Sequence, residues 1–365
     1  MYRTVDKKLL FPLIACSIFS VLLLYSIYIN KILPNVGSSY YKTQLVASVM
    51  GIAVCVVLTF VDYSSIARLW FIYGPASVVL ALLTFTPLGV SPGSGESGEW
   101  RRWIDIGITT IQPSEVLKLG FLLSFSYHLS KIKDCINRPV HVLLLLIHAL
   151  LPAAIAILQN DYGTGLIFIV MFITMVFAAG ISWKYILAGV LASPGIIWLT
   201  WTFLMTDMHR QRILVLFNPN SDPQGYEWQQ MLGKNALSTG GLLGQGLLKG
   251  TDYVYVSELH NDFIFAHIGQ TTGFVGCITV VILLGYVCIR IIAAGFTAKN
   301  ELGRNICMGV FAILFTHFVL NIGMVLKVLP VIGIPLPFLS GGGTAMVCMY
   351  TAVGLVMSVC RASNA

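Results

Sequence analysis

The chain has 365 residues, of which 57% are hydrophobic and 10% are charged, and its net charge is +7. A soluble domain carries about 25% charged residues, so this composition excludes an ordinary soluble protein and indicates an integral membrane protein. In such a protein a modest positive charge is typical of loop topology and of contact with anionic lipid, and we expect no nucleic-acid partner. The eight cysteines form no CxxC pair and lie mostly in apolar runs, so we expect no disulfide framework.

Apolar runs of membrane-spanning length dominate the sequence. A spanning helix needs about 20 apolar residues, and ten runs approach this length, although the fourth and sixth are short. The runs cover residues 9–28, 45–61, 69–88, 116–129, 140–158, 166–180, 185–205, 263–292, 306–328 and 344–359. The sequence therefore predicts an all-α polytopic membrane protein with about ten transmembrane helices, forming a single domain over residues 1–365.

The even number of spans places both termini on one side of the membrane. If the N-terminus is cytoplasmic, the inner loops hold somewhat more lysine and arginine than the outer ones. The positive-inside rule then favours cytoplasmic N- and C-termini. On this topology the segments 89–114, 206–261 and 329–343 lie outside. Their proline and glycine content disfavours regular helix, so we predict non-helical backbone there that is buried in protein or lines a wet cavity.

The longest polar segment, residues 206–261, is predicted to be a large extracytoplasmic loop between the seventh and eighth spans. It ends with His260 and Asp262, directly before the apolar run that starts at Phe263. A carboxylate at the mouth of a membrane helix, next to a loop rich in cations, is costly unless it is used. We therefore interpret Asp262 as the chemical centre. His260 is the only histidine that the spacing places near it, and no HExxH or Cys/His cluster indicates a zinc site.

Charged residues also occur inside or at the edge of two apolar runs. Glu115 and Lys118 lie three residues apart and share one helix face. They form either a local ion pair at a capped helix start or one wall of an interior cavity, and the burial of two charges favours the cavity. Asp161 precedes Gly163 and Thr164, and is equally consistent with an N-cap and with a site residue.

Four arginines on the outer side, Arg101, Arg102, Arg210 and Arg212, are candidates for gripping a phosphate-bearing head group. A guanidinium binds two phosphate oxygens at once, but an interfacial arginine can also bind lipid phosphate only. The glycines between residues 240 and 250 lack a preceding strand and a Gly-Lys-Ser/Thr ending, so we predict a tightly folded re-entrant loop and no nucleotide site.

The order and spacing of these motifs resemble one known family over essentially the whole chain. The matching motifs are Arg102-Trp103, Gln112-Pro113-Ser114-Glu115 with Lys118, 159–164, Arg210-Gln211-Arg212, Pro219, Asp222-Pro223, 238–246, Glu258 with His260 and 262–265, Asn321 with Gly323, and 329–343 including Ser340. They resemble the SEDS family (shape, elongation, division and sporulation proteins), and within it the RodA branch.

The resemblance implies a peptidoglycan glycosyltransferase that polymerises lipid II into glycan strands on the outer face of the bacterial cytoplasmic membrane during elongation. It implies that Asp262 is essential. It also adds Glu258 and Ser340 to the candidate substrate contacts already named from the sequence. Those are Arg102, Glu115, Lys118, Asp161, Arg210, Arg212 and His260. It also implies a class B penicillin-binding protein, a transpeptidase, as partner. The sequence departs from the family pattern at Gln270 and Thr271, where many members carry two glutamates, and at Asn160, Ser257 and Gly341.

The reaction needs a base at the acceptor hydroxyl and cations at the diphosphate leaving group. We expect Asp262 to act as the base and the nearby cations to bind the diphosphate, with a divalent ion (Mg²⁺ or Mn²⁺) as a conceivable helper. One carboxylate without a second as nucleophile favours a single inverting displacement. Three alternatives stay open at this stage: a division-branch (FtsW-like) polymerase, a lipid II flippase, and a proton-coupled transporter that uses Asp161, Glu115 and Lys118 as a relay.

Overall fold

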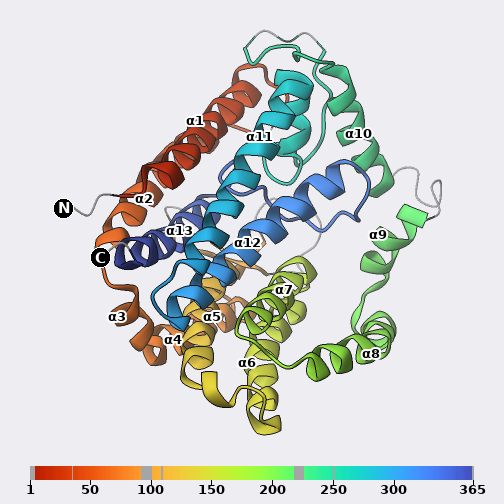
Figure 1. Cartoon of the computed structure of the whole chain (residues 1–365). Coiled ribbons are helices and arrows are strands. Elements are labelled where there is room, and N and C mark those ends of the chain that lie inside the picture. Colours follow the sequence, from red (N-terminus) through yellow and green to blue (C-terminus); the bar gives the residue numbers. More distant parts are fainter. Residues whose placement is uncertain are drawn as a thin grey trace.

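The structure is a computed structural model that describes residues 5–34, 36–91, 101–107, 110–217, 226–248, 250 and 252–363. These residues form a bundle of helices with little sheet (Figure 1). The helices are α1 (Lys7–Ile29), α2 (Ser38–Phe60), α3 (Tyr63–Arg68), α4 (Trp70–Leu82), α5 (Pro113–Lys131), α6 (Pro139–Leu158), α7 (Tyr162–Ala178), α8 (Trp183–Leu199), α9 (Asp207–Phe217), α10 (Tyr226–Thr239), α11 (Ile264–Phe296), α12 (Glu301–Val325) and α13 (Gly343–Ser363). Short 3-10 turns follow α4 (η1, Leu83–Phe85) and α5 (η2, Lys133–Cys135), and a π-helical turn follows α8 (η3, Thr200–Leu204).

Helices occupy all ten positions at which the sequence predicts a membrane span. Seven of those in the described residues are long and apolar enough to cross a membrane, namely α1, α2, α6, α8 with its π-helical end, α11, α12 and α13. The shorter apolar helices α4 and α7 and the more polar α5 fill the other three positions. α5 and α7 begin earlier than the apolar runs do, because Pro113 suits a first helical turn and Asp161 caps α7. The predicted all-α polytopic membrane fold is confirmed.

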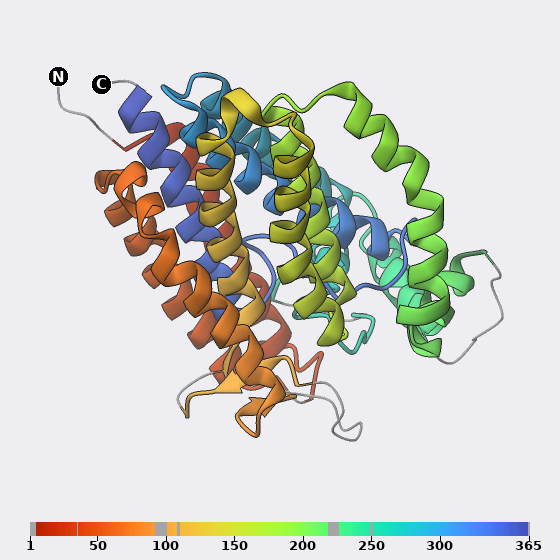
Figure 2. The same ribbon diagram turned by 90° about the horizontal axis from the view of Figure 1, so that it is seen from below.

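Ion pairs and hydrogen bonds identify one end of the bundle. Asp6, just before α1, pairs with Arg290 near the end of α11 at 2.8 Å. At the same end Lys133, after α5, pairs with Glu301 at the start of α12 at 3.1 Å. Figure 2 shows that the start of α1 and the end of α13 lie together. This arrangement agrees with the prediction that both ends of the chain lie on one side.

The helices on the interior of the bundle approach each other closely where small residues meet. A Cβ placed on Gly354 of α13 would lie 2.9 Å from the Cα of Cys55 in α2, and one placed on Gly51 would lie 2.6 Å from the ring of Tyr350. Such contacts let spanning helices pack without a hydrophobic driving force between them. α8 is the opposite case: none of its residues is buried, and it lies at the edge of the molecule (Figures 1 and 2).

The prediction of non-helical backbone is confirmed for the described part of the first outer segment before α5 and is wrong for the long loop. The first outer segment contains a three-stranded antiparallel sheet of β1 (Gly89–Val90), β2 (Trp103–Asp105) and β3 (Thr110–Ile111). The long loop contains α9 and α10, because its prolines and glycines gather at 219–225 and 240–250 and leave helix-forming sequence between them. The glycines 93, 95 and 98, Trp100 and the turn residues 219–225 lie outside the described residues.

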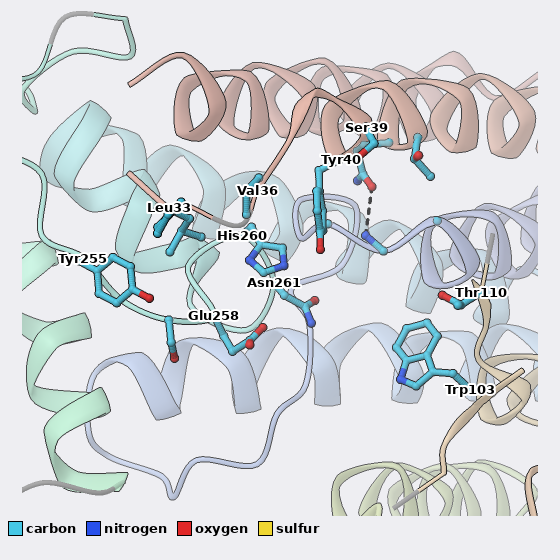
Figure 3. Close-up of a pocket in the computed structure, with 17 residues that line it drawn as sticks. Leu33, Val36, Ser39, Tyr40, Trp103, Thr110, Tyr255, Glu258, His260 and Asn261 are labelled. Carbon is cyan, nitrogen blue, oxygen red and sulfur yellow. Dashed lines mark hydrogen bonds between the residues drawn. The ribbon is translucent and has the colours of Figure 1, made fainter. Parts of the chain in front are cut away.

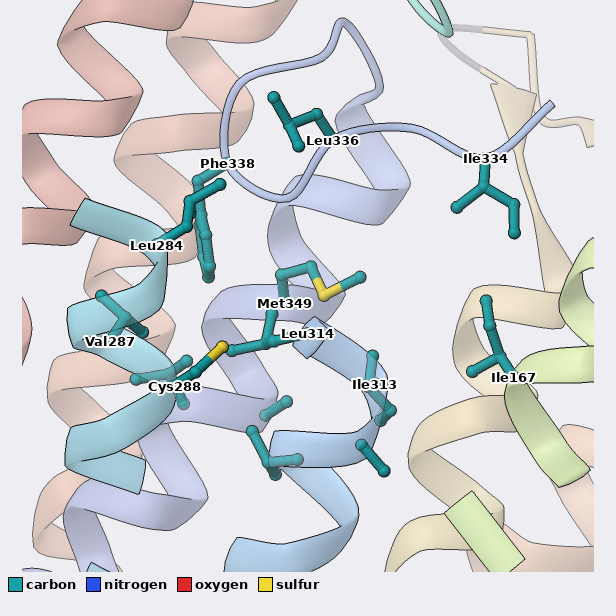
Figure 4. Close-up of a cluster of buried hydrophobic side chains, with 14 of the residues drawn as sticks. Ile167, Leu284, Val287, Cys288, Ile313, Leu314, Ile334, Leu336, Phe338 and Met349 are labelled. Carbon is teal, nitrogen blue, oxygen red and sulfur yellow. The ribbon is translucent and has the colours of Figure 1, made fainter. Parts of the chain in front are cut away.

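The third outer segment, between α12 and α13, has no regular structure, as predicted. Its apolar side chains anchor it to the helices of the bundle. Leu336 and Phe338 reach into an apolar cluster with Leu284 of α11, Leu314 of α12 and Met349 of α13 (Figure 4). Phe338 also packs edge-on against Tyr350, with ring centroids 5.1 Å apart. Two large buried side chains therefore fix a segment whose backbone has no regular structure.

The glycine-rich tract folds tightly against a break in α11. Gly273 has φ 68° and ψ −164°, which interrupts the helix. The freed backbone groups bond to the tract: Phe274 N donates to Gly241 O at 2.9 Å and Gly246 N donates to Thr271 O at 3.0 Å. A Cβ on Gly244 would lie 2.3 Å from the backbone of Thr271, so only glycine allows this approach.

Candidate functional site

The turn that carries Asp262 covers residues 257–263, at the N-terminal mouth of α11. It is closed by two bonds to one carbonyl, because Asn261 N and Phe263 N donate to Glu258 O at 3.1 and 3.0 Å. Leu259 and Phe263 are completely buried. These apolar anchors point the polar residues of the turn away from the core. We call this segment the Asp262 turn.

A set of buried amide and hydroxyl groups holds the Asp262 turn in place. Asn321 of α12 donates to the carbonyls of Asp262 and Ile334, both at 2.8 Å. The Ser340 hydroxyl donates to Asn261 O at 2.6 Å and accepts from Leu336 N at 2.8 Å. The turn is thereby tied both to α12 and to the segment between α12 and α13, so its geometry does not depend on flexible loop residues.

The Asp262 carboxylate is enclosed and unsatisfied within the described part of the chain. Its Oδ1 has no exposed surface and no hydrogen-bond partner among the described residues. Burial, and then the neighbouring Glu258, raise the pKa of Asp262 to about 7, while Arg212 and Arg102 act to lower it. A carboxylate with a pKa near neutrality and a free acceptor oxygen is suited to take a proton from a substrate hydroxyl.

The two arginines that act on Asp262 come from different elements. Arg102, directly before β2, donates from Nε to Gln159 O at 3.1 Å and from Nη2 to Asn160 O at 2.6 Å. Arg212 of α9 donates to Val331 O at 3.3 Å. Both also act with burial to lower the pKa of His209 to about 4. Arg102 and Arg212 therefore form the basic side of Asp262, and His209 lies near both arginines as a neutral imidazole.

Arg210, two residues from Arg212, has a different environment. Its guanidinium donates to the carbonyls of Trp201 and Thr202 at 2.9 and 3.0 Å, at the end of α8. It also pairs with the exposed Asp207 at 3.1 Å. It is absent from the charges that shift the pKa of Asp262. This geometry favours an anchoring role for Arg210 at the α8–α9 junction.

Glu115 and Lys118 form a buried pair inside the bundle. Lys118 Nζ lies 2.7 Å from Glu115 Oε1, and the two side chains are 2% and 3% exposed. Lys118 also contacts His317 Nε2 at 2.9 Å, while His317 Nδ1 lies 3.0 Å from Pro335 O. The ion pair is therefore present, while the second oxygen, Glu115 Oε2, has no partner among the described residues, and a place in the wall of a substrate cavity stays a prediction. The contact from Lys118 to His317 also ties α5 to the segment that carries Ser340.

Asp161 acts as a helix cap. Its carboxylate accepts from Thr164 N at 3.0 Å and from Thr164 Oγ1 at 2.8 Å, and it lies near enough to Asp262 to raise the pKa of that group slightly. The neighbouring Asn160 stands where the family pattern usually has a proline. Its φ of 56° is a left-handed backbone that proline cannot adopt. The departure from the family pattern at this position therefore goes with a different local backbone.

Glu258 and His260 face the other side of the Asp262 turn. Together with Asn261 they line a cavity of about 560 Å³, whose walls also include Tyr40, Trp103 and Tyr255 (Figure 3). The His260 ring packs edge-on against Tyr40, with centroids 5.1 Å apart, and burial lowers its pKa to about 4. Burial also raises the pKa of Glu258. Asp262 itself does not line this cavity.

The described residues do not form a metal site of their own. They contain no group of three histidine, cysteine or acidic side chains placed to hold an ion. Of the acidic groups near Asp262, Asp161 already uses both oxygens on Thr164. Among the described residues, the carboxylates left near this position are Asp262 and Glu258, which are fewer than the oxygen ligands that a divalent ion usually takes from protein and solvent together.

Several residues that shape the site gave no clear signal in the sequence. His209, His317 and Gln44 are single polar residues in helical segments, and sequence spacing does not show which neighbours they meet. Gln44 binds Ser340 O and Gly342 N at 3.0 and 3.1 Å. Gln270 and Thr271, the departures in α11, have a structural role: Gln270 accepts from Val254 N at 3.1 Å, and Thr271 accepts from Gly246 N.

The fold and the site define a multi-pass membrane protein with a carboxylate and two arginines gathered at one end of its helical bundle. The chain belongs to the family of cell cycle proteins that includes FtsW, RodA and SpoVE, whose model matches residues 7–365. This is the SEDS family that the sequence motifs resemble.

Named relatives and solved structures agree with this membership. The peptidoglycan glycosyltransferase MrdB of Escherichia coli is 30% identical over 357 residues, which cover 97% of this chain and 93% of the relative. The probable peptidoglycan glycosyltransferase FtsW of Trichlorobacter lovleyi is 28% identical, with 97% and 92% covered. A chain from a peptidoglycan synthase complex that coordinates polymerization and crosslinking matches with a TM-score of 0.81 at 24% identity, with 99% and 98% covered. The rod shape determining protein RodA of Thermus thermophilus matches with a TM-score of 0.71 at 23% identity, with 100% and 99% covered.

Proposed function

We propose that this protein is a peptidoglycan glycosyltransferase that polymerises lipid II into glycan strands, with Asp262 as the general base. The observation that carries the proposal is the Asp262 carboxylate, which combines an oxygen without a partner among the described residues, a pKa of about 7 and two neighbouring guanidinium groups. The names of the relatives MrdB and FtsW support the same activity.

The chemistry follows from this arrangement. Asp262 accepts the proton from the 4-hydroxyl of the acceptor sugar as that oxygen attacks C1 of the donor sugar. The bond from C1 to the diphosphate oxygen breaks, and the lipid diphosphate leaves with the electron pair. An α-linked donor then gives a β-linked product by single inversion. Because the diphosphate is already a good leaving group, the site needs cations there and no general acid.

Arg102 and Arg212 are the proposed partners of the diphosphate. Their guanidinium groups act on the Asp262 carboxyl, so a diphosphate beside the base lies within their reach. A divalent ion enters the proposal only as a companion of the substrate diphosphate, since the described residues form no three-ligand site. Glu115, Lys118 and Ser340 support the Asp262 turn through their bonds to protein groups, and Glu258 and His260 face the cavity beside it.

The cellular setting is part of the same proposal. The excess of lysine and arginine in alternate loops favours cytoplasmic termini and an outward-facing site in the bacterial cytoplasmic membrane. The likeness to a chain of a peptidoglycan synthase complex supports a class B penicillin-binding protein as the transpeptidase partner. The likeness to MrdB and to RodA supports the elongation branch over the division branch.

Purified protein incubated with fluorescent lipid II tests the proposal. We expect polymer that muramidase digests to disaccharides with β-1,4 linkage, and we expect Asp262→Asn to give none. A parallel assay in lipid vesicles measures movement of lipid II across the bilayer. Transport without polymer would contradict the proposal and would identify the protein as a flippase.

A further inference from the structure

The Asp262 turn separates two different environments. On one side, a Cβ placed on Gly333 would lie 3.3 Å from Asp262 Oδ2, and the guanidinium groups of Arg102 and Arg212 act on the carboxyl. On the other side, Glu258, His260 and Asn261 line the cavity of about 560 Å³. The proposed chemistry uses the first side and leaves the second without a role.

The charge of the cavity excludes a diphosphate as its ligand. None of the described residues that line it is a lysine or an arginine, and its one charged group is the Glu258 carboxylate. A phosphate there would meet a like charge and no counter-ion, which is unfavourable in a partly buried site. The ligand that fits is therefore neutral in the part that enters the cavity.

The shape and chemistry of the walls suit a sugar. In Figure 3, Tyr255 and Trp103 lie at opposite ends, and Glu258, His260 and Asn261 lie between them. An aromatic ring can cover the apolar C–H face of a pyranose, while carboxylate, amide and hydroxyl groups bind its hydroxyls and acetamido groups. The volume also falls within the roughly 300–1,000 Å³ that is usual for ligand pockets.

The cavity has a rigid base, so it exists before any ligand binds. Gln44 is 1% exposed and bonds to Ser340 O and Gly342 N, which fixes the glycine wall at residues 341–343. Gly341 N donates to His260 O at 2.9 Å and joins this wall to the Asp262 turn. A ligand in the cavity would therefore be held in fixed register with the reacting group on the other side of the turn.

We propose that this cavity is a saccharide-binding site that holds neutral N-acetylhexosamine units of the substrate, namely those remote from the diphosphate, while Arg102 and Arg212 hold the diphosphate across the turn. This inference rests on the proposed function, and it adds a second binding site with its own ligand chemistry. Tyr40, Trp103 and Tyr255 are the specificity-determining residues of the site.

Photo-crosslinking with a lipid-free probe tests the site directly. The probe is a β-1,4-linked N-acetylglucosamine tetrasaccharide that carries a diazirine, applied to the full chain in detergent micelles. We expect mass spectrometry to find label within residues 33–44 or 252–261. Unlabelled tetrasaccharide should compete, and inorganic pyrophosphate should not. Absence of specific label in these segments, or competition by pyrophosphate, would overturn the inference.

Three variants separate a binding role from a folding defect. Tyr255→Ala removes an aromatic wall and should lower labelling about tenfold. Gly342→Phe fills the cavity, and its Cβ meets only an ordinary contact of 3.6 Å with Ala345, so the backbone tolerates it. Tyr286→Ala removes a tyrosine of similar exposure outside the cavity and should change nothing. Undiminished labelling of Gly342→Phe would contradict the proposed site.

Variants of the reaction side show whether the saccharide site and the polymerase activity fail separately. Labelling should persist in Asp262→Asn and Arg212→Ala, because neither residue lines the cavity. Loss of labelling in Arg212→Ala would move the ligand to the basic side and overturn the inference. Wild-type protein that is labelled in the cavity but makes no polymer from lipid II would contradict the proposed function and leave the saccharide site standing.

Discussion

Two membrane helices of this protein contrast with each other: α5 is polar but largely buried, whereas α8 is apolar but has no buried residue. α5 carries Glu115 and Lys118 and is too polar to count among the long apolar spans, yet thirteen of its nineteen residues are buried. α8 is almost entirely apolar, with Lys184 in its first turn, and none of its residues is buried. In a bilayer the lipid accepts apolar side chains as readily as the protein does, so polarity and not hydrophobicity marks the interior.

The same division separates the two arginines of α9. Arg210 bonds to the carbonyls at the end of α8 and belongs to the exposed periphery. Arg212 bonds to Val331 O and acts on Asp262, so it belongs to the polar interior that includes α5, α12 and the Asp262 turn. We therefore expect substitutions in the polar interior to lower activity or stability, and substitutions on the α8 side to change both only slightly.

The largest effect is expected at the centre of the polar interior. Asp262→Asn keeps the size of the side chain and removes the base, so polymerisation should fall by about 10²–10⁴-fold, the usual contribution of a general base. Expression, membrane insertion and thermal stability should stay near the wild-type values. The measurement is polymer formed per mole of folded protein. Near-normal polymer from this variant would remove Asp262 from the mechanism.

The acidity of Asp262 gives a second prediction. Burial raises its pKa from the usual 3.8 to about 7, so the carboxylate form that can act as base predominates only above that pH. Polymerisation should therefore rise as pH increases through about 7 and fall below it. A rate that stays constant from pH 5 to pH 8 would show that ionisation of Asp262 does not limit the reaction.

The buried pair in α5 should affect stability first. Lys118→Met leaves Glu115 and His317 without their shared partner in a buried site, and breaking such a pair costs roughly 3–5 kcal/mol. Activity per folded molecule should also fall, because His317 contacts Pro335 O in the segment that supports the Asp262 turn. The control is Lys131→Met at the exposed end of the same helix. Wild-type thermal stability of Lys118→Met would show that the pair is dispensable to the fold.

The charge-swapped double variant sharpens this test. Glu115→Lys combined with Lys118→Glu retains one charge of each sign but places a carboxylate beside His317. A swapped protein that recovers both stability and polymerisation would show that only the presence of a pair matters. We expect it to fold better than Lys118→Met and to remain less active than the wild type, since the contact from Lys118 to His317 Nε2 is lost.

The two arginines of α9 provide a matched comparison. Arg212→Ala should weaken the use of lipid II and should move the acid limb of the pH profile to higher pH, because Arg212 lowers the pKa of Asp262. Arg212→Lys should recover only part of the activity, since an ammonium group cannot bind two phosphate oxygens in a fixed plane. Arg210→Ala should leave the pH profile unchanged. Equal shifts in both variants would remove the distinction between the two positions.

The smallest effect is expected on α8. Leu187→Ala, at a side chain that is 48% exposed, should change stability by no more than about 0.5 kcal/mol. Leu122→Ala on α5, at a fully buried position, should cost several times more, because the cavity that it leaves loses its packing contacts. Thermal unfolding of the two variants in the same detergent makes the comparison. Similar losses in the two variants would indicate that Leu187 is packed against other side chains and does not face lipid.

The sequence predicted the membrane fold well because a span is defined by length and apolarity alone. It also placed Asp262 at a helix mouth and Arg102 and Arg212 on its side of the bundle. It did not distinguish Arg210 from Arg212, since residues two apart in sequence can have unrelated neighbours once α9 forms. Nor did it show that Lys118 meets His317, because a contact between α5 and α12 has no local sequence signature.

The outer segments show the same limit in another form. Their proline and glycine content indicated loops, yet α9, α10 and a small sheet form between those residues. The support of the Asp262 turn by Gln44, Asn321 and Ser340 depends on contacts among α2, α12 and the segment before α13. Such contacts between distant parts of the chain are set by tertiary packing and not by local preference.

The break at Gly273 divides α11 into two mechanical parts. The part that follows Asp262 accepts hydrogen bonds from the glycine-rich tract at Gln270 O and Thr271 O, and the part beyond the break donates to the same tract from Phe274 N and Val275 N before it continues to Phe296. A Cβ on Gly273 would lie 2.5 Å from Gly244 N, so this joint admits no side chain. The glycine-rich tract therefore acts as a splint across the break, and it fixes the angle between the membrane helix and the helical segment that begins beside Asp262.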